Sequence, residues 1–143
     1  MQRFFDAIGD RRDRAMFLLM LRCGTRISEV ADLQLADLYL GEEPPRLVAH
    51  GKCSKDRTIY LSPQAVRALR AYLACRPAAP SDSVFLSYLG EGLSTTAIHK
   101  RLIIYHQRAG VHVTAHRLRH SFANDLLTAD VPVTSIQKLL GHR

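Results

Sequence analysis

The chain has 143 residues, a length that fits one domain with a buried core. Its net charge of +7 and isoelectric point near 9.8 favour a polyanionic partner, most often nucleic acid, over a small-molecule substrate. Three cysteines without CxxC spacing argue against a disulfide framework, and the longest apolar run is too short to span a bilayer. Because the charged N-terminus is unlike a signal peptide, we expect a cytoplasmic protein.

Two helices are predicted at the start of the chain. Residues 11–23 show the i, i+3, i+4 apolar spacing of a helix, and Gly24 marks its end. A second helix is predicted to begin at Thr25 as its N-cap. In its first turn Arg26 precedes Glu29 by three residues, so the carboxylate can pair with the guanidinium and hold it in place.

A small antiparallel sheet is predicted next. The runs 46–50 and 57–61 are short segments of β type, and a polar turn separates them. They therefore predict a hairpin, with Lys52 and Lys55 in its turn. Residues 37–40 predict a third, edge strand.

The rest of the chain is predicted to be mainly helical. Residues 84–87 form a short strand or an extended segment. Caps and apolar spacing predict four helices, over residues 62–77, 94–110, 114–130 and 131–141. The expected fold class is α+β, mainly α-helical, with one small antiparallel sheet.

Positive charge is concentrated late in the chain, because residues 92–124 contain no Asp or Glu. Within the helix predicted at 114–130, the spacing places His116, Arg119 and His120 on one side. Arginine binds phosphate with two parallel hydrogen bonds, and histidine moves protons near neutral pH. A helix N-terminus adds free N–H groups that point at an anion. The pattern predicts a phosphate site.

A metal site is the competing interpretation of this helix. His112, His116 and His120 are spaced by four residues, and two histidines at this spacing can bind zinc. No carboxylate lies nearby in the sequence, however, and Arg119 on the same side would repel a cation. We therefore expect no metal and no other cofactor.

Four stretches, taken together and in order, resemble the catalytic domain of the tyrosine recombinase (phage integrase) family. The resemblance extends from about residue 10 to residue 142. The stretches are GTRISEVADL, with the first arginine; HGKCSKDRTIYL, with the hairpin lysine; HRLRHSFANDLL, with the His-x-x-Arg box; and IQKLLGH, with the last histidine. The resemblance implies the helical catalytic core of this family, with a three-stranded sheet.

The resemblance also implies the roles of single residues. Arg26 and Arg119 would hold the non-bridging oxygens of the scissile phosphate and stabilise charge in the transition state. Lys52 would be the general acid that protonates the leaving 5′ oxygen. His116 would act as a base or proton relay, and His142 would hydrogen-bond the phosphate. The family uses no metal, because two arginines supply the positive charge.

Supporting roles follow from the same resemblance and from the basic residues around it. Glu29 would orient Arg26, and His120 would be structural. Further contacts with DNA are expected from Lys55, Lys100, Arg101 and Arg117.

The chain departs from the family in three respects. Cys53 stands where the family usually has glycine in the hairpin turn. The family's nucleophilic tyrosine should follow His142, and none of the five tyrosines stands in such a context. The usual N-terminal DNA-clamping domain is also missing. We therefore expect residues 1–143 to be a fragment, a monomer that is inactive alone, of a nucleoid-associated bacterial or phage enzyme that is tetrameric on double-stranded DNA.

Three other functions compete with this one. A non-catalytic DNA-binding or regulatory truncation would use the same fold and basic face. A helix-turn-helix regulator would use the helix at 131–141 but would leave the hairpin lysine and Arg26 without a role. A type IB topoisomerase shares the mechanism, although the compact hairpin is more typical of recombinases.

Overall fold

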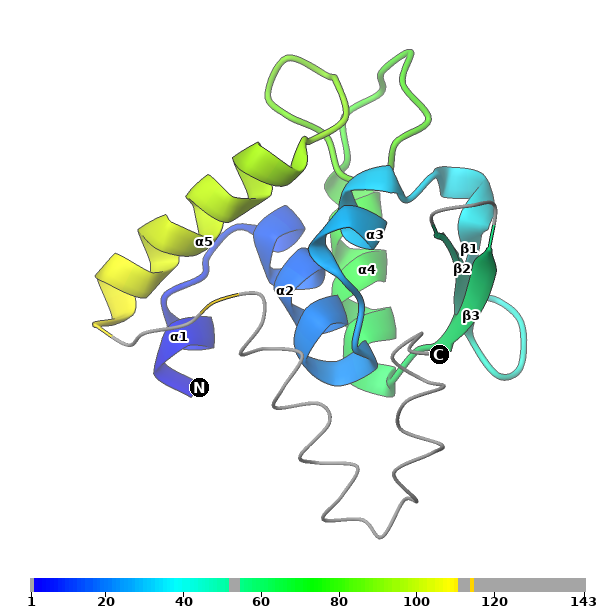
Figure 1. The fold of residues 1–143 in the computed structure, drawn as a ribbon, viewed down its shortest axis with the longest axis horizontal. Helices are drawn as coiled ribbons and strands as arrows, with labels where there is room; N and C mark the ends of the chain where they lie inside the picture. Colours follow the sequence, from blue (N-terminus) through cyan, green and yellow to red (C-terminus); the bar gives the residue numbers. More distant parts are fainter. Residues whose placement is uncertain (1, 52–54, 111–113, 115–143) are drawn as a thin grey trace, which may run out of the picture.

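The computed structural model describes residues 2–51, 55–110 and 114 (Figure 1). Over these residues the fold is α+β, as predicted, with one three-stranded antiparallel sheet. In chain order the elements are α1 (Gln2–Asp6), α2 (Arg11–Cys23), α3 (Ile27–Asp32), the 3-10 helix η1 (Leu35–Asp37), β1 (Leu38–Tyr39), β2 (Arg46–His50), β3 (Asp56–Tyr60), α4 (Pro63–Cys75) and α5 (Thr95–Ala109). The helices predicted at 114–130 and 131–141 lie outside the described residues.

Local caps set the ends of the longer helices. Gly24 ends α2 in the left-handed conformation (φ 72°), and Gly110 ends α5 in the same way (φ 65°). Ser62 accepts a hydrogen bond from the Ala65 N–H (3.2 Å) and so caps α4, with Pro63 in the first turn. The predicted limits of α2 and α5 and the predicted start of α4 are confirmed, whereas α4 ends at Cys75, before residue 77.

The start of α3 differs from the prediction, because Arg26 and not Thr25 is its N-cap. The N–H of Thr25 donates to Leu19 O of α2 (3.3 Å), so Thr25 belongs to the end of the preceding helix. Its hydroxyl is buried and makes no hydrogen bond. Helix α3 ends at Asp32, because Leu33 is extended and Gln34 forms an isolated bridge with Ser83.

The sheet has the order β1-β2-β3, with β1 at the edge as predicted. In the hairpin, Ala49 of β2 pairs with Arg57 of β3. Residues 84–87, predicted as a short strand or an extended segment, form no strand, and Leu86 makes one isolated bridge with Gly92.

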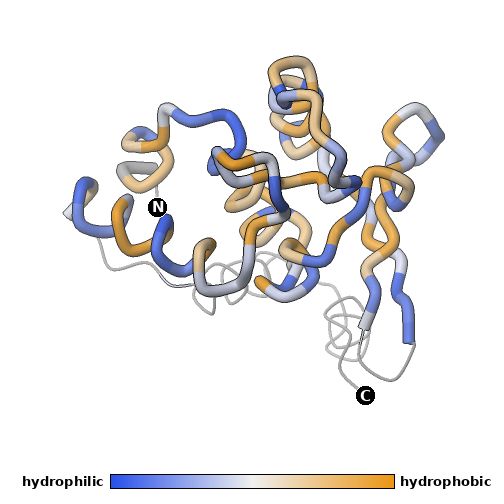
Figure 2. The backbone as a smooth tube through the Cα atoms, turned by 90° about the horizontal axis from the view of Figure 1, so that it is seen from above, coloured by the Kyte–Doolittle hydropathy of each residue, from blue (hydrophilic) through white to orange (hydrophobic). Residues whose placement is uncertain are grey.

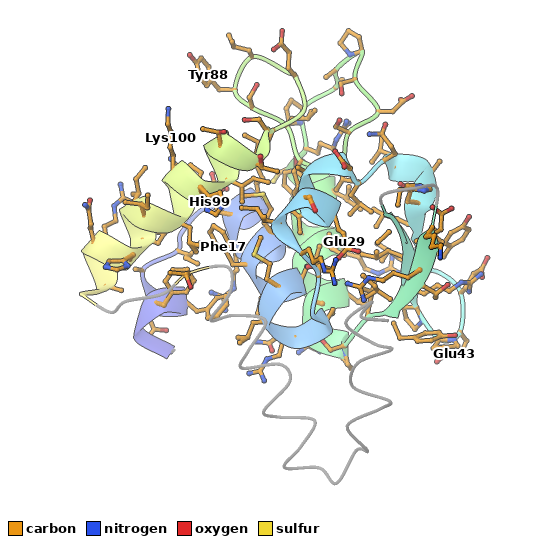
Figure 3. The ribbon with its side chains drawn as sticks, in the orientation of Figure 1. Phe17, Glu29, Glu43, Tyr88, His99 and Lys100 are labelled. Atoms are coloured by element: carbon orange, nitrogen blue, oxygen red, sulfur yellow. The ribbon has the colours of Figure 1, made fainter. Side chains whose placement is uncertain are left out.

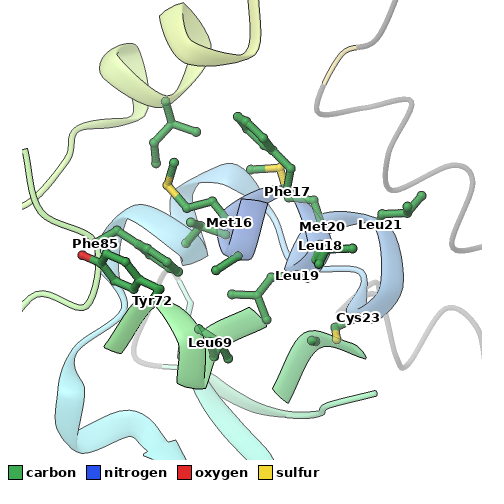
Figure 4. Close-up of a cluster of buried hydrophobic side chains, with 14 of the residues drawn as sticks. Met16, Phe17, Leu18, Leu19, Met20, Leu21, Cys23, Leu69, Tyr72 and Phe85 are labelled. Atoms are coloured by element: carbon green, nitrogen blue, oxygen red, sulfur yellow. The ribbon is translucent and has the colours of Figure 1, made fainter. Parts of the chain in front are cut away.

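The core lies on both sides of α2. Helices α2 and α4 are antiparallel neighbours, and Leu19, Leu69 and Tyr72 are buried in this region (Figure 4). Toward α5, Phe17 packs against Tyr105 with ring centroids 6.1 Å apart. Hydrophobic and hydrophilic positions are interspersed along the chain (Figure 2). Helices α4 and α5 each bury one side, whereas α2 is buried at every position from Ala15 to Leu21. Among the described helices, none is long and apolar enough to cross a membrane.

Candidate functional site

Arg26 lies at the junction of α2 and α3, directly after the left-handed turn at Gly24. Its backbone is extended (φ −86°, ψ 154°), and its N–H donates to Glu29 Oε1 (2.8 Å). The Glu29 side chain thus satisfies an N–H at the helix start, as a capping box does. The side chain of Arg26 is half-buried at this site.

Glu29 is ionised and held by a second arginine that the sequence analysis did not select. Arg57 Nε donates to Glu29 Oε2 (2.8 Å), and Arg57 Nη2 donates to Glu29 Oε1 (2.6 Å). Burial raises the pKa of Glu29, but the hydrogen bonds from Arg57 and from the Arg26 N–H, with the charges of both arginines, outweigh burial and lower this pKa overall. The carboxylate therefore accepts from the Arg26 backbone and forms an ion pair with Arg57.

Arg57 reaches this position from the second residue of β3. Its Nη2 also donates to Gly24 O (3.2 Å), so one guanidinium contacts the residues on both sides of Arg26. The sequence offers a signal for this contact, because Arg57 and Ile59 share one side of β3 by the two-residue period of a strand. Ile59 is buried in the core, which places Arg57 on the packed side of the sheet.

The predicted lysine loop connects β2 to β3, and its residues 52–54 lie outside the described part of the chain. The Gly51 N–H donates to Lys55 O (2.9 Å) and closes the loop. A Cβ at Gly51 would collide with Lys55 O, so the close approach requires glycine here. Lys55 itself is exposed at the hairpin end.

A histidine with two carboxylates lies at the base of this loop. His50 Nε2 is 2.8 Å from Asp37 Oδ1, and His50 Nδ1 is 2.9 Å from Asp56 Oδ1. The hydrogen bonds to Asp37 and then to Asp56 raise the pKa of His50. The protonated imidazole can donate to both carboxylates, which ties η1 to the end of the hairpin.

The two predicted DNA contacts on α5 differ in their surroundings. Lys100 is exposed, and Figure 3 shows it in a different part of the molecule from Glu29. Arg101 donates from Nη2 and Nε to Asp13 Oδ2 (2.8 and 2.9 Å) and from Nη2 to Tyr105 Oη (3.0 Å). The guanidinium of Arg101 is therefore bound within the fold.

The structure thus brings together Arg26, Glu29, Arg57 and the ends of the lysine loop. Six of the predicted site residues lie outside the part of the chain that the structure describes, namely Lys52, His116, Arg117, Arg119, His120 and His142. Within the described residues, no group of three His, Cys, Asp or Glu is placed to hold a metal ion. The geometry assembles fixed positive charge beside a loop that carries basic residues.

Comparison with known proteins identifies the family. The phage integrase family matches residues 1–143. Tyrosine recombinase XerC of Haemophilus ducreyi is 38% identical over 141 residues, which cover 96% of this chain and 46% of that protein. Tyrosine recombinase XerC of Chromobacterium violaceum is 37% identical over 136 residues, which cover 93% of this chain and 45% of that protein. The chain spans less than half the length of these curated relatives.

Solved structures agree with this assignment. The crystal structure of XerA recombinase matches with a TM-score of 0.89 and 28% identity, over 99% of this chain and 52% of that chain. XerH recombinase, in a post-cleavage complex with palindromic difH substrate, matches with a TM-score of 0.84 and 25% identity, over 99% of this chain and 44% of that chain. The fold is therefore that of a tyrosine recombinase catalytic domain. The chain belongs to the phage integrase family, the family of tyrosine recombinases that its sequence resembles.

Proposed function

We propose that the chain is the catalytic domain of a site-specific DNA recombinase. In the complete enzyme, strands are cut and rejoined through a 3′-phosphotyrosyl intermediate, which retains the energy of the broken bond. Arg26 and Arg119 hold the scissile phosphate, and Lys52 protonates the leaving 5′ oxygen. His116 moves the proton of the nucleophile, and His142 hydrogen-bonds the phosphate.

One observation carries the proposal, namely that Arg57 joins the Arg26 turn to the β2–β3 hairpin. Strand cleavage needs positive charge on the non-bridging oxygens and a proton for the leaving oxygen. In this chain the arginine for the first task lies on the turn, and the lysine for the second lies in the hairpin loop. A direct contact between the two segments supports a shared site for both tasks.

The proposed substrate is double-stranded DNA. XerH, which is similar to this chain, was solved in complex with its difH substrate, and the net charge of +7 suits a polyanion. By analogy with the family, we expect the complete protein to act in the cytoplasm as four subunits on two DNA duplexes. This chain alone is expected to be a monomer.

The test separates phosphate activation from binding. The chain is incubated with supercoiled plasmid and a small exogenous nucleophile such as hydrogen peroxide, and nicked circles are counted on a gel. We expect nicking by the unaltered chain and a loss of nicking in Arg26→Ala, while most of the DNA affinity survives. Exposed Arg67→Ala on α4 is the matched loss of an arginine outside the site, and it should keep the nicking activity.

Two results would contradict the proposal in different ways. Binding of DNA without nicking, with or without the nucleophile, would favour the non-catalytic DNA-binding function. Failure of the chain to bind DNA at low salt would reject both functions.

A further inference from the structure

Arg57 contacts the Arg26 turn at two points. Its Nη2 donates to Gly24 O (3.2 Å), two residues before Arg26, and to Glu29 Oε1 (2.6 Å), three residues after it. The same Glu29 Oε1 accepts the N–H of Arg26 (2.8 Å). Arg57 therefore contacts the chain on both sides of Arg26, and it shares Glu29 Oε1 with the Arg26 N–H.

Arg57 is also close to the lysine loop. It pairs with Ala49 across the hairpin, and the loop closes two residues further on, at Gly51 and Lys55. A strand advances about 3.3 Å per residue, so the loop begins about 7 Å from Arg57 along the strand.

Stability alone does not account for a charged pair at this position. The side chains of Glu29 and Arg57 are 8% and 16% exposed, so both charges are largely removed from water. The cost of this desolvation offsets the attraction, and apolar pairs of similar volume are often as stable. Two parallel N–H···O bonds, in contrast, fix orientation as well as distance, which an apolar pair cannot do.

We propose that Arg57 is a positioning residue that holds the Arg26 turn against strand β3 and so orients Arg26 toward the phosphate. This inference rests on the proposed function. Arg57 does not touch the DNA and acts through Arg26.

The test measures the salt dependence of duplex DNA binding by fluorescence anisotropy, between about 50 and 200 mM salt. The logarithm of the affinity falls with the logarithm of the salt concentration, and each lost phosphate contact reduces this slope by about 0.9. We expect Arg26→Ala to lose one contact. Arg57→Lys should lose a similar fraction of the slope, because lysine cannot form the bidentate pair. The double variant should lose no more than Arg26→Ala.

Arg76→Lys is the matched control. Arg76 is a second partly buried arginine that braces the fold, by donating to the carbonyls of Ser81, Ser83 and Val84 (2.7–3.2 Å). Its replacement should lower Tm and leave the salt slope unchanged. If Arg57→Lys does not fold, Glu29→Gln tests the same contact, because the amide keeps an acceptor for the Arg26 N–H.

Three results would contradict the positioning role of Arg57. A normal slope in folded Arg57→Lys or Glu29→Gln, with Arg26→Ala reduced, would overturn the positioning role and leave the proposed function intact. Additive losses in the double variant would mean that Arg57 contacts DNA directly, which also overturns it. A normal slope in Arg26→Ala itself would reject the phosphate role of Arg26 and, with it, the inference.

Discussion

The replacement Asp13→Asn should destabilise the domain strongly, because Asp13 is a fully buried carboxylate that joins α2 to α5. Its Oδ1 accepts from Arg12 Nε (3.0 Å), and its Oδ2 accepts from Arg101 Nε (2.9 Å) and Tyr105 Oη (2.7 Å). Burial and the hydrogen bond to Asp13 raise the pKa of Tyr105 to about 12, so its hydroxyl remains a donor at neutral pH. Asparagine keeps the shape but removes the charge, and its amide turns a donor toward one arginine.

The size of the destabilisation by Asp13→Asn depends on how exposed Arg12 and Arg101 are. Removing one partner of a buried ion pair costs about 3–5 kcal/mol. The side chains of Arg12 and Arg101 are 17% and 32% exposed, so water can solvate part of their charge after the change. We therefore expect a loss of about 3 kcal/mol, at the low end of the range. For a domain of this size, that loss lowers Tm by roughly 10 °C.

Thermal unfolding followed by circular dichroism at pH 7 measures the effect. Tyr105→Phe deletes one hydrogen bond to the same carboxylate and should cost about 1.5–3 kcal/mol. The double variant should be less destabilised than the sum of the two single variants, because both changes break one network. Exposed Asp82→Asn is the control and should leave Tm nearly unchanged. A fall in Asp13→Asn no larger than that of the control would refute the network as a source of stability.

Three further outcomes are expected. Because Asp37 and Asp56 raise the pKa of His50, its stabilisation is complete below the ordinary value of 6.5 and is lost as pH rises through the raised value. In His50→Gln, the free energy of unfolding, measured by urea titration, should depend less on pH in this range. An unchanged pH dependence would contradict the role of His50. Leu69→Ala opens a cavity in the fully buried core and should cost about 2–5 kcal/mol by chemical denaturation, more than the same change at partly buried Leu73. The 143-residue chain should form no covalent adduct with duplex DNA on a denaturing gel, so an adduct would reject the inference that none of its tyrosines is the nucleophile.

Features that depend on neighbouring residues could be predicted from the sequence. Gly24, Ser62 and Gly110 end or begin helices because the required backbone angles and side-chain acceptors are properties of the residue and its immediate neighbours. The hairpin follows from the two-residue period of its strands and the polar turn between them. The position of Arg26 beside this hairpin came from the family resemblance.

Contacts between distant residues could not be predicted in the same way. Thr25 has the chemistry of an N-cap, but its N–H is taken by the end of α2, so the cap moves to Arg26. The pairing of Glu29 with Arg26 follows from a spacing of three residues, whereas its bidentate partner Arg57 is 28 residues away. Local sequence patterns do not specify whether Glu29 binds Arg26 or Arg57, because Arg57 comes close to Glu29 only when the β2–β3 hairpin packs against α3.

The buried ion pairs also change how the basic composition should be understood. Asp13 forms an ion pair with Arg101, and Glu29 forms one with Arg57. Both arginines are therefore bound within the fold, although basic residues surround them in the sequence. Each pair removes one charge of either sign from the surface, which leaves the net charge of +7 unaltered. The positive surface is therefore formed by the remaining basic residues, and fewer acidic residues lie between them. A DNA backbone responds to this excess of unpaired positive charge, so the count of arginines in a stretch is a weaker guide to DNA contacts than their partners in the fold.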